Sequence, residues 1–254
     1  MRKVTVLLAL FLSLSNAQAA RAGGSSVALA QVQLPGGSLE PRLRALEALV
    51  AEVAQRTSIS TTLRTRPLDV GGPDLFDHPL LLLPTTAPLP DLKLEAGTAL
   101  ATWLRLGGTL FLDWQGGAGD MEAFRTSLEG FVATTIPGGR LERVSRASVL
   151  YRSFYRLSYA SGRVRLVDDV YGVMVDGRYA LIVSFNDMLS AAERTADGAY
   201  RFEMVPGGER QREDAIRFLV NIVAYTLCLD YKDDKVHLDY LKSKRNWQLP
   251  GDEP

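Results

Sequence analysis

Two short apolar runs constrain the fold of this chain more than any other feature of its sequence. Four leucines occupy residues 80–83 between two prolines, and residues 110–112 form a second apolar run that follows Gly-Gly-Thr and ends at Asp113. Runs this short are typical of strands covered on both faces, as in the middle of a parallel sheet. We therefore expect the two runs to lie side by side, with helices covering both faces of their sheet.

Strand and helix patterns alternate along the rest of the chain. Strands are predicted at 27–34, 59–68, 80–83, 109–112, 170–175 and 178–185, and helices at 43–53, 92–103, 120–132 and after 208. This alternation predicts a mainly parallel α/β layered fold with right-handed crossovers. Asp176-Gly177 is a strong two-residue turn signal, so an antiparallel hairpin arm is also expected.

The N-terminus has the three parts of a secretory signal peptide. Arg2 and Lys3 precede an uncharged apolar stretch at residues 4–14, and Ala17-Gln18-Ala19 offers a cleavage site. The apolar stretch is too short to cross a bilayer, which needs about 20 residues. We expect residues 1–19 to be removed, with cleavage as late as residue 22 also open, to give a periplasmic or secreted product that does not span a membrane. The alternative is an uncleaved N-terminal anchor.

Beyond the signal peptide, residues 25–229 are predicted to form one α/β domain, followed by a charged tail at residues 230–254. The tail loses its apolar period and carries three aromatic residues, Tyr231, Tyr240 and Trp247. Exposed aromatic side chains often anchor interfaces, so these three are candidates for docking on an envelope protein partner. His237 lies among acids and lysines in this tail, and we interpret that group as solvated rather than as a metal site.

Composition excludes two classes of protein. The chain has 29 Lys and Arg residues against 29 Asp and Glu residues, and its basic residues are scattered, so no nucleic-acid footprint is present. The single cysteine excludes an internal disulfide and a cysteine-based zinc site.

Several segments, in order, resemble a bacterial family known as domain-of-unknown-function family 4159. They are residues 49–58, 74–76, 78–80, 107–113, 152–155, 184–187, 205–213 and 221–223. The resemblance implies a flavodoxin-like sheet with helices on both faces, of the class I glutamine amidotransferase-like type, and frequent export. It implies no established reaction, and a fold alone does not supply one.

The residues needed for amidotransferase chemistry are missing. That chemistry requires a nucleophile on a sharp strand-to-helix turn, but the strand that ends at Asp113-Trp114-Gln115 has neither Cys nor Ser at the bend. Cys228 lies near the end of the last predicted helix, where a cysteine usually acts as a small hydrophobe. We therefore name no catalytic residue, cofactor or metal ligand, and expect a non-catalytic domain.

Polar residues follow several of the predicted strands, where open parallel sheets bind their ligands. These candidates are Thr85, Thr86, Asp113, Trp114, Asn186 and Asp187. If they converge, they would bind a polar ligand or a protein partner at the strand-end edge. A second interpretation is that Asp113, Asn186 and Asp187 only make turns where strands leave the sheet. The alternative function is an exported carboxylate- or metal-dependent hydrolase that uses Asp113 or Asp187.

Overall fold

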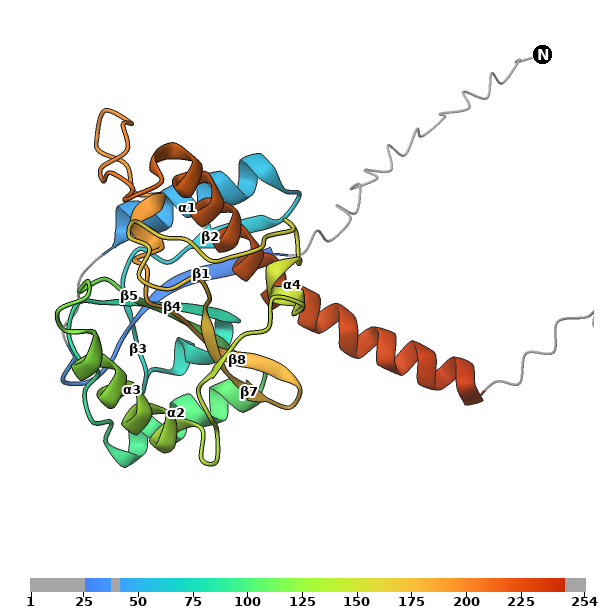
Figure 1. Cartoon of the computed structure of the whole chain (residues 1–254). Helices are drawn as coiled ribbons and strands as arrows, with labels where there is room; N and C mark the ends of the chain where they lie inside the picture. Colours follow the sequence, from blue (N-terminus) through green and yellow to red (C-terminus); the bar gives the residue numbers. More distant parts are fainter. Residues whose placement is uncertain (1–25, 38–41, 245–254) are drawn as a thin grey trace, which may run out of the picture.

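The protein is a layered α/β domain built on one mainly parallel sheet (Figure 1). The computed structural model describes residues 26–37 and 42–244, with the backbone alone from residue 228 onward. The strands are β1 (Ser26–Gln33), β2 (Ser60–Leu63), β3 (Leu68–Asp69), β4 (Leu80–Thr85), β5 (Thr109–Trp114), β6 (Glu142–Arg143), β7 (Tyr171–Val175) and β8 (Arg178–Ser184). The helices are α1 (Leu43–Arg56), α2 (Leu94–Arg105), α3 (Met121–Thr135) and α4 (Gly208–Lys244), with short 3₁₀ turns η1 (Pro73–Asp77), η2 (Val149–Tyr151) and η3 (Leu189–Ala191).

The strands lie in the order β2-β1-β4-β5-β8-β7-β6, and β3 adds a short pairing to β1. The pairs from β2 to β8 are parallel, whereas β7 is antiparallel to both of its neighbours. The five parallel strands thus follow the doubly wound order of flavodoxin-like folds, in which strand order reverses beside β1. This arrangement confirms the predicted fold class, and the finer likeness to amidotransferases stays a prediction.

The two apolar runs are neighbours, as the sequence predicts. Leu81 is paired with Leu110 and Leu83 with Leu112 across β4 and β5, and all four side chains are buried. Because successive residues of a strand point to opposite faces, each run feeds two cores. Leu80 and the other even-numbered leucine of its run pack with α1 and α4, whereas the odd-numbered leucines pack with α2 and α3. The sheet is therefore covered on both faces (Figure 1).

The hairpin arm is also confirmed. Asp176 and Gly177 join β7 to β8 with φ angles of 50° and 80°. Positive φ at both central residues is the backbone of a type I′ turn, which suits the twist of the flanking strands.

Two predicted elements differ from the structure. The strand expected at 59–68 is divided into β2 and β3, because the chain bends at residues 65–66 and Pro67 has no N–H to donate to a ladder. The tail expected to lack regular structure from residue 230 is instead helical to Lys244, and this part of α4 extends away from the sheet (Figure 1). No Gly or Pro occurs between residues 209 and 244, so little opposes continuation of the helix.

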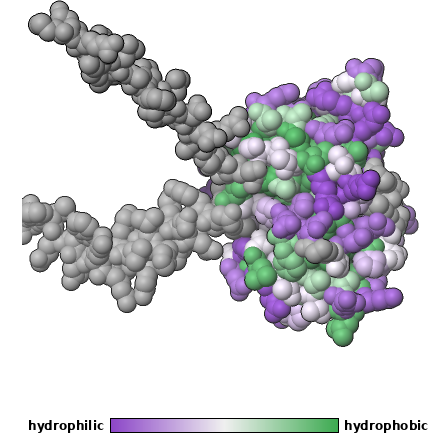
Figure 2. Space-filling model, turned by 180° about the vertical axis from the view of Figure 1, so that it is seen from behind, coloured by the Kyte–Doolittle hydropathy of each residue, from purple (hydrophilic) through white to green (hydrophobic). Residues whose placement is uncertain are grey.

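The surface and the helices of the described residues relate to the prediction that the protein does not span a membrane. Figure 2 shows hydrophilic residues over much of the face behind the view of Figure 1, with hydrophobic residues in small, interrupted patches. Within the described residues, every helix is too short or too polar to cross a bilayer. The predicted signal peptide at residues 1–19 lies outside the described part of the chain.

Candidate functional site

The pleat of the sheet divides the predicted strand-end residues between its two faces. Trp114 packs in the core beside α2 and α3, and Thr85 lies on the same side because it follows Leu83 at a two-residue step. Asp113 points to the opposite side, where it contacts the backbone of η3. The predicted set therefore does not form one pocket.

Thr85 and Trp114 stabilise local structure. The Thr85 hydroxyl donates to the Ala87 carbonyl oxygen at 2.8 Å and accepts from the Ala87 N–H at 3.2 Å, so it closes a turn after β4. The Trp114 indole is fully buried, stacks on Phe124 with ring centroids 4.4 Å apart, and donates to the Gly117 carbonyl oxygen at 2.8 Å. Thr86, which follows, is half-buried at the same end of β4.

Asp113 is the most perturbed acid of the strand-end edge. Its carboxylate is fully buried and accepts the N–H groups of Met188 and Leu189, each at 2.8 Å, so it caps the start of η3. Burial, and then the negative charge of Asp187, raise the pKa of Asp113 to about 7. Hydrogen bonds from the two N–H groups and from Ser184 act in the opposite direction. A carboxyl group with this pKa can hold or release a proton near neutral pH.

Asp187 is the second member of a buried carboxylate pair with Asp113. It adopts a left-handed backbone conformation with φ of 54°, and only 2% of it is exposed. Its Oδ2 accepts a hydrogen bond from the Arg163 guanidinium, whereas its Oδ1 has no hydrogen-bond partner among the described residues. A buried and unpartnered carboxylate oxygen is costly, so this position is strained in both backbone and side chain.

Asn186 has a structural role. Its Oδ1 accepts the N–H groups of Leu166 and Val167 at 2.9 and 3.1 Å, and its Nδ2 donates to the carbonyl oxygens of Val167 and Ala160 at 2.7 and 3.3 Å. The amide is thus fully used in holding the 160–167 loop against the end of β8. This geometry agrees with the interpretation of Asn186 as a turn residue.

Three arginines converge beside this carboxylate pair, and the sequence did not indicate them. The guanidinium carbons of Arg42, Arg163 and Arg201 lie 5.7, 5.9 and 5.2 Å from the centroid of the Phe202 ring. We call Arg42, Arg163, Arg201 and Phe202 the arginine cluster. Guanidinium groups at this distance from a ring are attracted to its π face. The members come from the start of α1 and from two irregular loops, so no periodic pattern could have connected them.

Acids and an amide hold the arginine cluster in place. The buried Glu193 accepts from Arg42 at 3.1 Å and from Arg201 at 2.6 Å. Gln115 accepts from Arg42 Nε at 2.9 Å, and its own amide reaches Asp113 Oδ2 at 3.5 Å. The arginine cluster and the carboxylate pair therefore form one network at the carboxyl end of the sheet. In this network three guanidinium groups lie near the carboxylates of Glu193 and Asp187 and near Asp113, whose pKa is close to neutrality.

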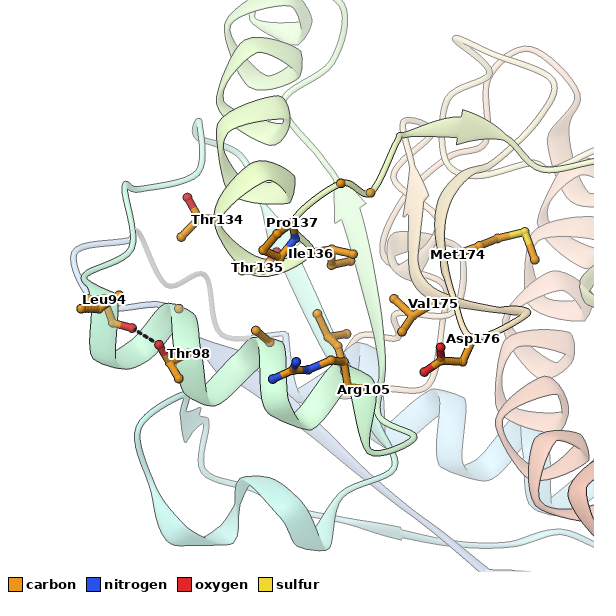
Figure 3. A pocket seen from close by; sticks show the side chains of 15 residues that line it. Leu94, Thr98, Arg105, Thr134, Thr135, Ile136, Pro137, Met174, Val175 and Asp176 are labelled. Atoms are coloured by element: carbon orange, nitrogen blue, oxygen red, sulfur yellow. Dashed lines mark hydrogen bonds between the residues drawn. The ribbon is translucent and has the colours of Figure 1, made fainter.

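Two other features lie apart from this network. A cavity of about 600 Å³ lies between α2, the end of α3 and the β7–β8 hairpin (Figure 3). Among the residues whose side chains the structure describes, no group of three or more His, Cys, Asp or Glu could hold a metal ion. The candidate docking residues Tyr231 and Tyr240 occur in the part of α4 that extends from the sheet, and Trp247 is outside the described residues.

The fold and the network define a doubly wound α/β domain with a charged edge at the carboxyl ends of its parallel strands. The chain belongs to the family described as Domain of unknown function (DUF4159), whose model matches residues 28–227. The match spans the sheet and both helix layers, and it includes Asp113 and Asp187. No curated protein matches the chain.

Proposed function

We propose that this chain is an exported, non-catalytic α/β domain that binds an anionic polar ligand or the acidic surface of an envelope protein partner at its strand-end edge. The arginine cluster is the observation that carries this proposal. Export is supported by the signal-peptide pattern of residues 1–19.

The charge balance of the edge favours an anion. Three guanidinium groups meet the carboxylates of Glu193 and Asp187, and Asp113 carries less than a full negative charge near pH 7 because its pKa is raised. Arg201 is the most accessible of the three, with 53% of its side chain exposed, and Arg163 is 31% exposed. Guanidinium groups bind carboxylates and phosphates through paired N–H donors, so a ligand with such a group fits this edge.

A hydrolase is the second candidate, favoured by one observation. The pKa of Asp113 is raised to about 7 beside a second carboxylate, which is the electrostatic pattern of a general acid or base. However, both oxygens of Asp113 already accept backbone N–H groups and the side chain is fully buried. A substrate would have to displace η3 to reach it, so we favour the binding function.

Isothermal titration with citrate and with an acidic peptide of six glutamates tests the binding function. We expect the purified protein to bind at least one probe, more weakly as salt is raised, and Arg201→Gln to weaken that binding at least fivefold. Arg165→Gln is the matched control, because Arg165 is also a partly exposed arginine paired with an acid, Asp168, but is not part of the arginine cluster. The absence of binding for both probes, or an equal loss in both variants, would refute the proposal.

The hydrolase is tested with aryl ester, aryl phosphate and peptide substrates between pH 5 and 9. Turnover with a midpoint near pH 7 that disappears in Asp113→Asn would replace the binding function with catalysis. Export is tested separately by expression of the full chain and mass determination of the periplasmic product. We expect a mature N-terminus within residues 20–23, and retention of Met1 would contradict cleavage.

A further inference from the structure

The cavity of about 600 Å³ is a groove on the opposite side of the sheet from the arginine cluster. Its floor is α2, and its walls are the end of α3 with residues 134–139 and the tip of the β7–β8 hairpin (Figure 3). Pockets that hold small organic molecules have volumes of about 300–1,000 Å³. Gly97 lets the two helices approach closely here, since a Cβ at that position would lie 3.1 Å from Thr134 Cγ2.

The walls of this groove are mixed, with somewhat more apolar than polar surface, and they are partly open to solvent. The apolar residues that line it include Leu94, Ala101, Leu104, Ile136, Met174 and Val175. Leu94 is 86% exposed and Met174 is 50% exposed. Large apolar side chains with this exposure around a concave surface are typical of a binding site. The apolar body of a ligand would cover them.

Arg105 is the one cation that lines the groove within the described part of the chain. Figure 3 shows its side chain running back along α2, with the guanidinium above the helix in the groove. Among the described residues, this guanidinium makes no hydrogen bond and no ion pair, in contrast to the arginines of the arginine cluster. A guanidinium beside exposed apolar side chains provides a charged anchor for a carboxylate.

Asp176 limits the charge of the ligand. It lines the same groove from the hairpin tip and does not pair with Arg105. A dianion such as a phosphate ester would be repelled by this carboxylate more strongly than a monoanion would be.

We propose that the groove binds a small amphipathic monocarboxylate, with its carboxylate on Arg105 and its apolar chain along α2 toward Leu94. The helix rises about 16 Å along its axis from Leu94 to Arg105, which matches an extended acyl chain of medium length. This site is independent of the function proposed for the strand-end edge, and its test does not involve that edge.

Isothermal titration with dodecanoate and with dodecylammonium, both below their micellar concentrations, tests the site. The two probes have the same chain and opposite charge. We expect dodecanoate to bind at least tenfold more tightly, and Arg105→Gln to reduce this preference to less than threefold. Asp176→Asn should leave dodecanoate affinity unchanged or increase it a few-fold. The control Arg44→Gln, at an exposed position of α1 on the other face, should leave both affinities unchanged.

Blocking variants locate the bound chain. Ala101→Trp fills the middle of the groove and should abolish dodecanoate binding, and Thr98→Trp does the same from an exposed position of α2 that tolerates a large side chain. The thermal unfolding midpoint of each variant shows that it is folded. The proposal is overturned if dodecanoate does not bind, if Arg105→Gln leaves its affinity unchanged, or if folded blocking variants still bind it.

Discussion

Replacement of Asp113 by Asn tests whether the pKa of this buried carboxyl group is raised or ordinary. The pKa of Asp113 rises from 3.8 to about 7 on folding, because burial and the charge of Asp187 oppose its ionisation. Between these two pH values the folded protein holds a proton that the unfolded chain has released. The free energy of unfolding must therefore fall as pH rises through this window. At about 1.4 kcal/mol per pH unit, the full loss is about 4 kcal/mol.

An asparagine at position 113 cannot ionise, so Asp113→Asn removes this pH dependence. The variant keeps one oxygen to accept from η3 but turns its amide N–H₂ toward the other backbone N–H, which costs about 1–2 kcal/mol. We expect the variant to be less stable than the natural protein at pH 4, and more stable by about 2 kcal/mol at pH 8. The two stability curves should cross near pH 5.

Urea unfolding at several pH values from 4 to 8 measures both curves, with Glu47→Gln on the exposed face of α1 as a control that should follow the natural protein. Parallel curves for Asp113→Asn and the natural protein would show that Asp113 ionises with an ordinary pKa. That result would also remove the electrostatic argument for acid or base chemistry at this position.

Five further changes, at four places in the chain, test other parts of the structure. Asp187→Asn should keep the fold and lower the pKa of Asp113, so the pH-dependent loss of stability moves to lower pH. Asp187→Ala should lower the free energy of unfolding by at least about 1 kcal/mol more than Asp187→Asn does, because Ala tolerates a φ of 54° poorly. Equal losses of stability in the two variants would contradict this. Gly162→Ala should cost about 3 kcal/mol or more, since its Cβ would clash with the Asn186 carbonyl oxygen, and a melting temperature within about 2 °C of the natural value would argue against that packing. Asn221→Ala should cost about 2–4 kcal/mol in urea unfolding because the amide makes four hydrogen bonds to residues 150–155, and a smaller loss would mean that this loop is held by other contacts. Deletion of residues 231–254 should leave the melting temperature nearly unchanged. If the aromatic residues there dock on an envelope partner, the deletion should remove that partner from pull-downs. Unchanged partners would exclude a docking role for these residues.

Much of the fold was predictable because its signals are local. The leucine runs at 80–83 and 110–112 are short, apolar and bounded, and Asp176-Gly177 favours one turn type without help from distant residues. The division of the predicted strand at 59–68 was less visible, because it depends on which backbone groups find partners on β1.

The candidate site was predictable only in part. That Asp113 and Asp187 share one edge follows from parallel strands, whose carboxyl ends meet. The two-residue period could also have shown that Thr85 and Trp114 point away from Asp113, because they continue the alternation of Leu83 and Leu112. The condition that all these side chains converge is therefore not met, and the binding role of the individual residues stays a prediction.

By itself, the sequence determined the sheet, its covered faces and the hairpin, since neighbouring residues set the period of apolar side chains and the conformation of turns. Only the tertiary structure decided that Arg42, Arg163 and Arg201 surround one aromatic ring, and that Arg105 lines a groove without an ion-pair partner among the described residues. Arg163 and Arg201 lie on irregular loops, which carry no periodic signal. Arg105 belongs to α2, but its helical period does not show which elements pack beside that helix.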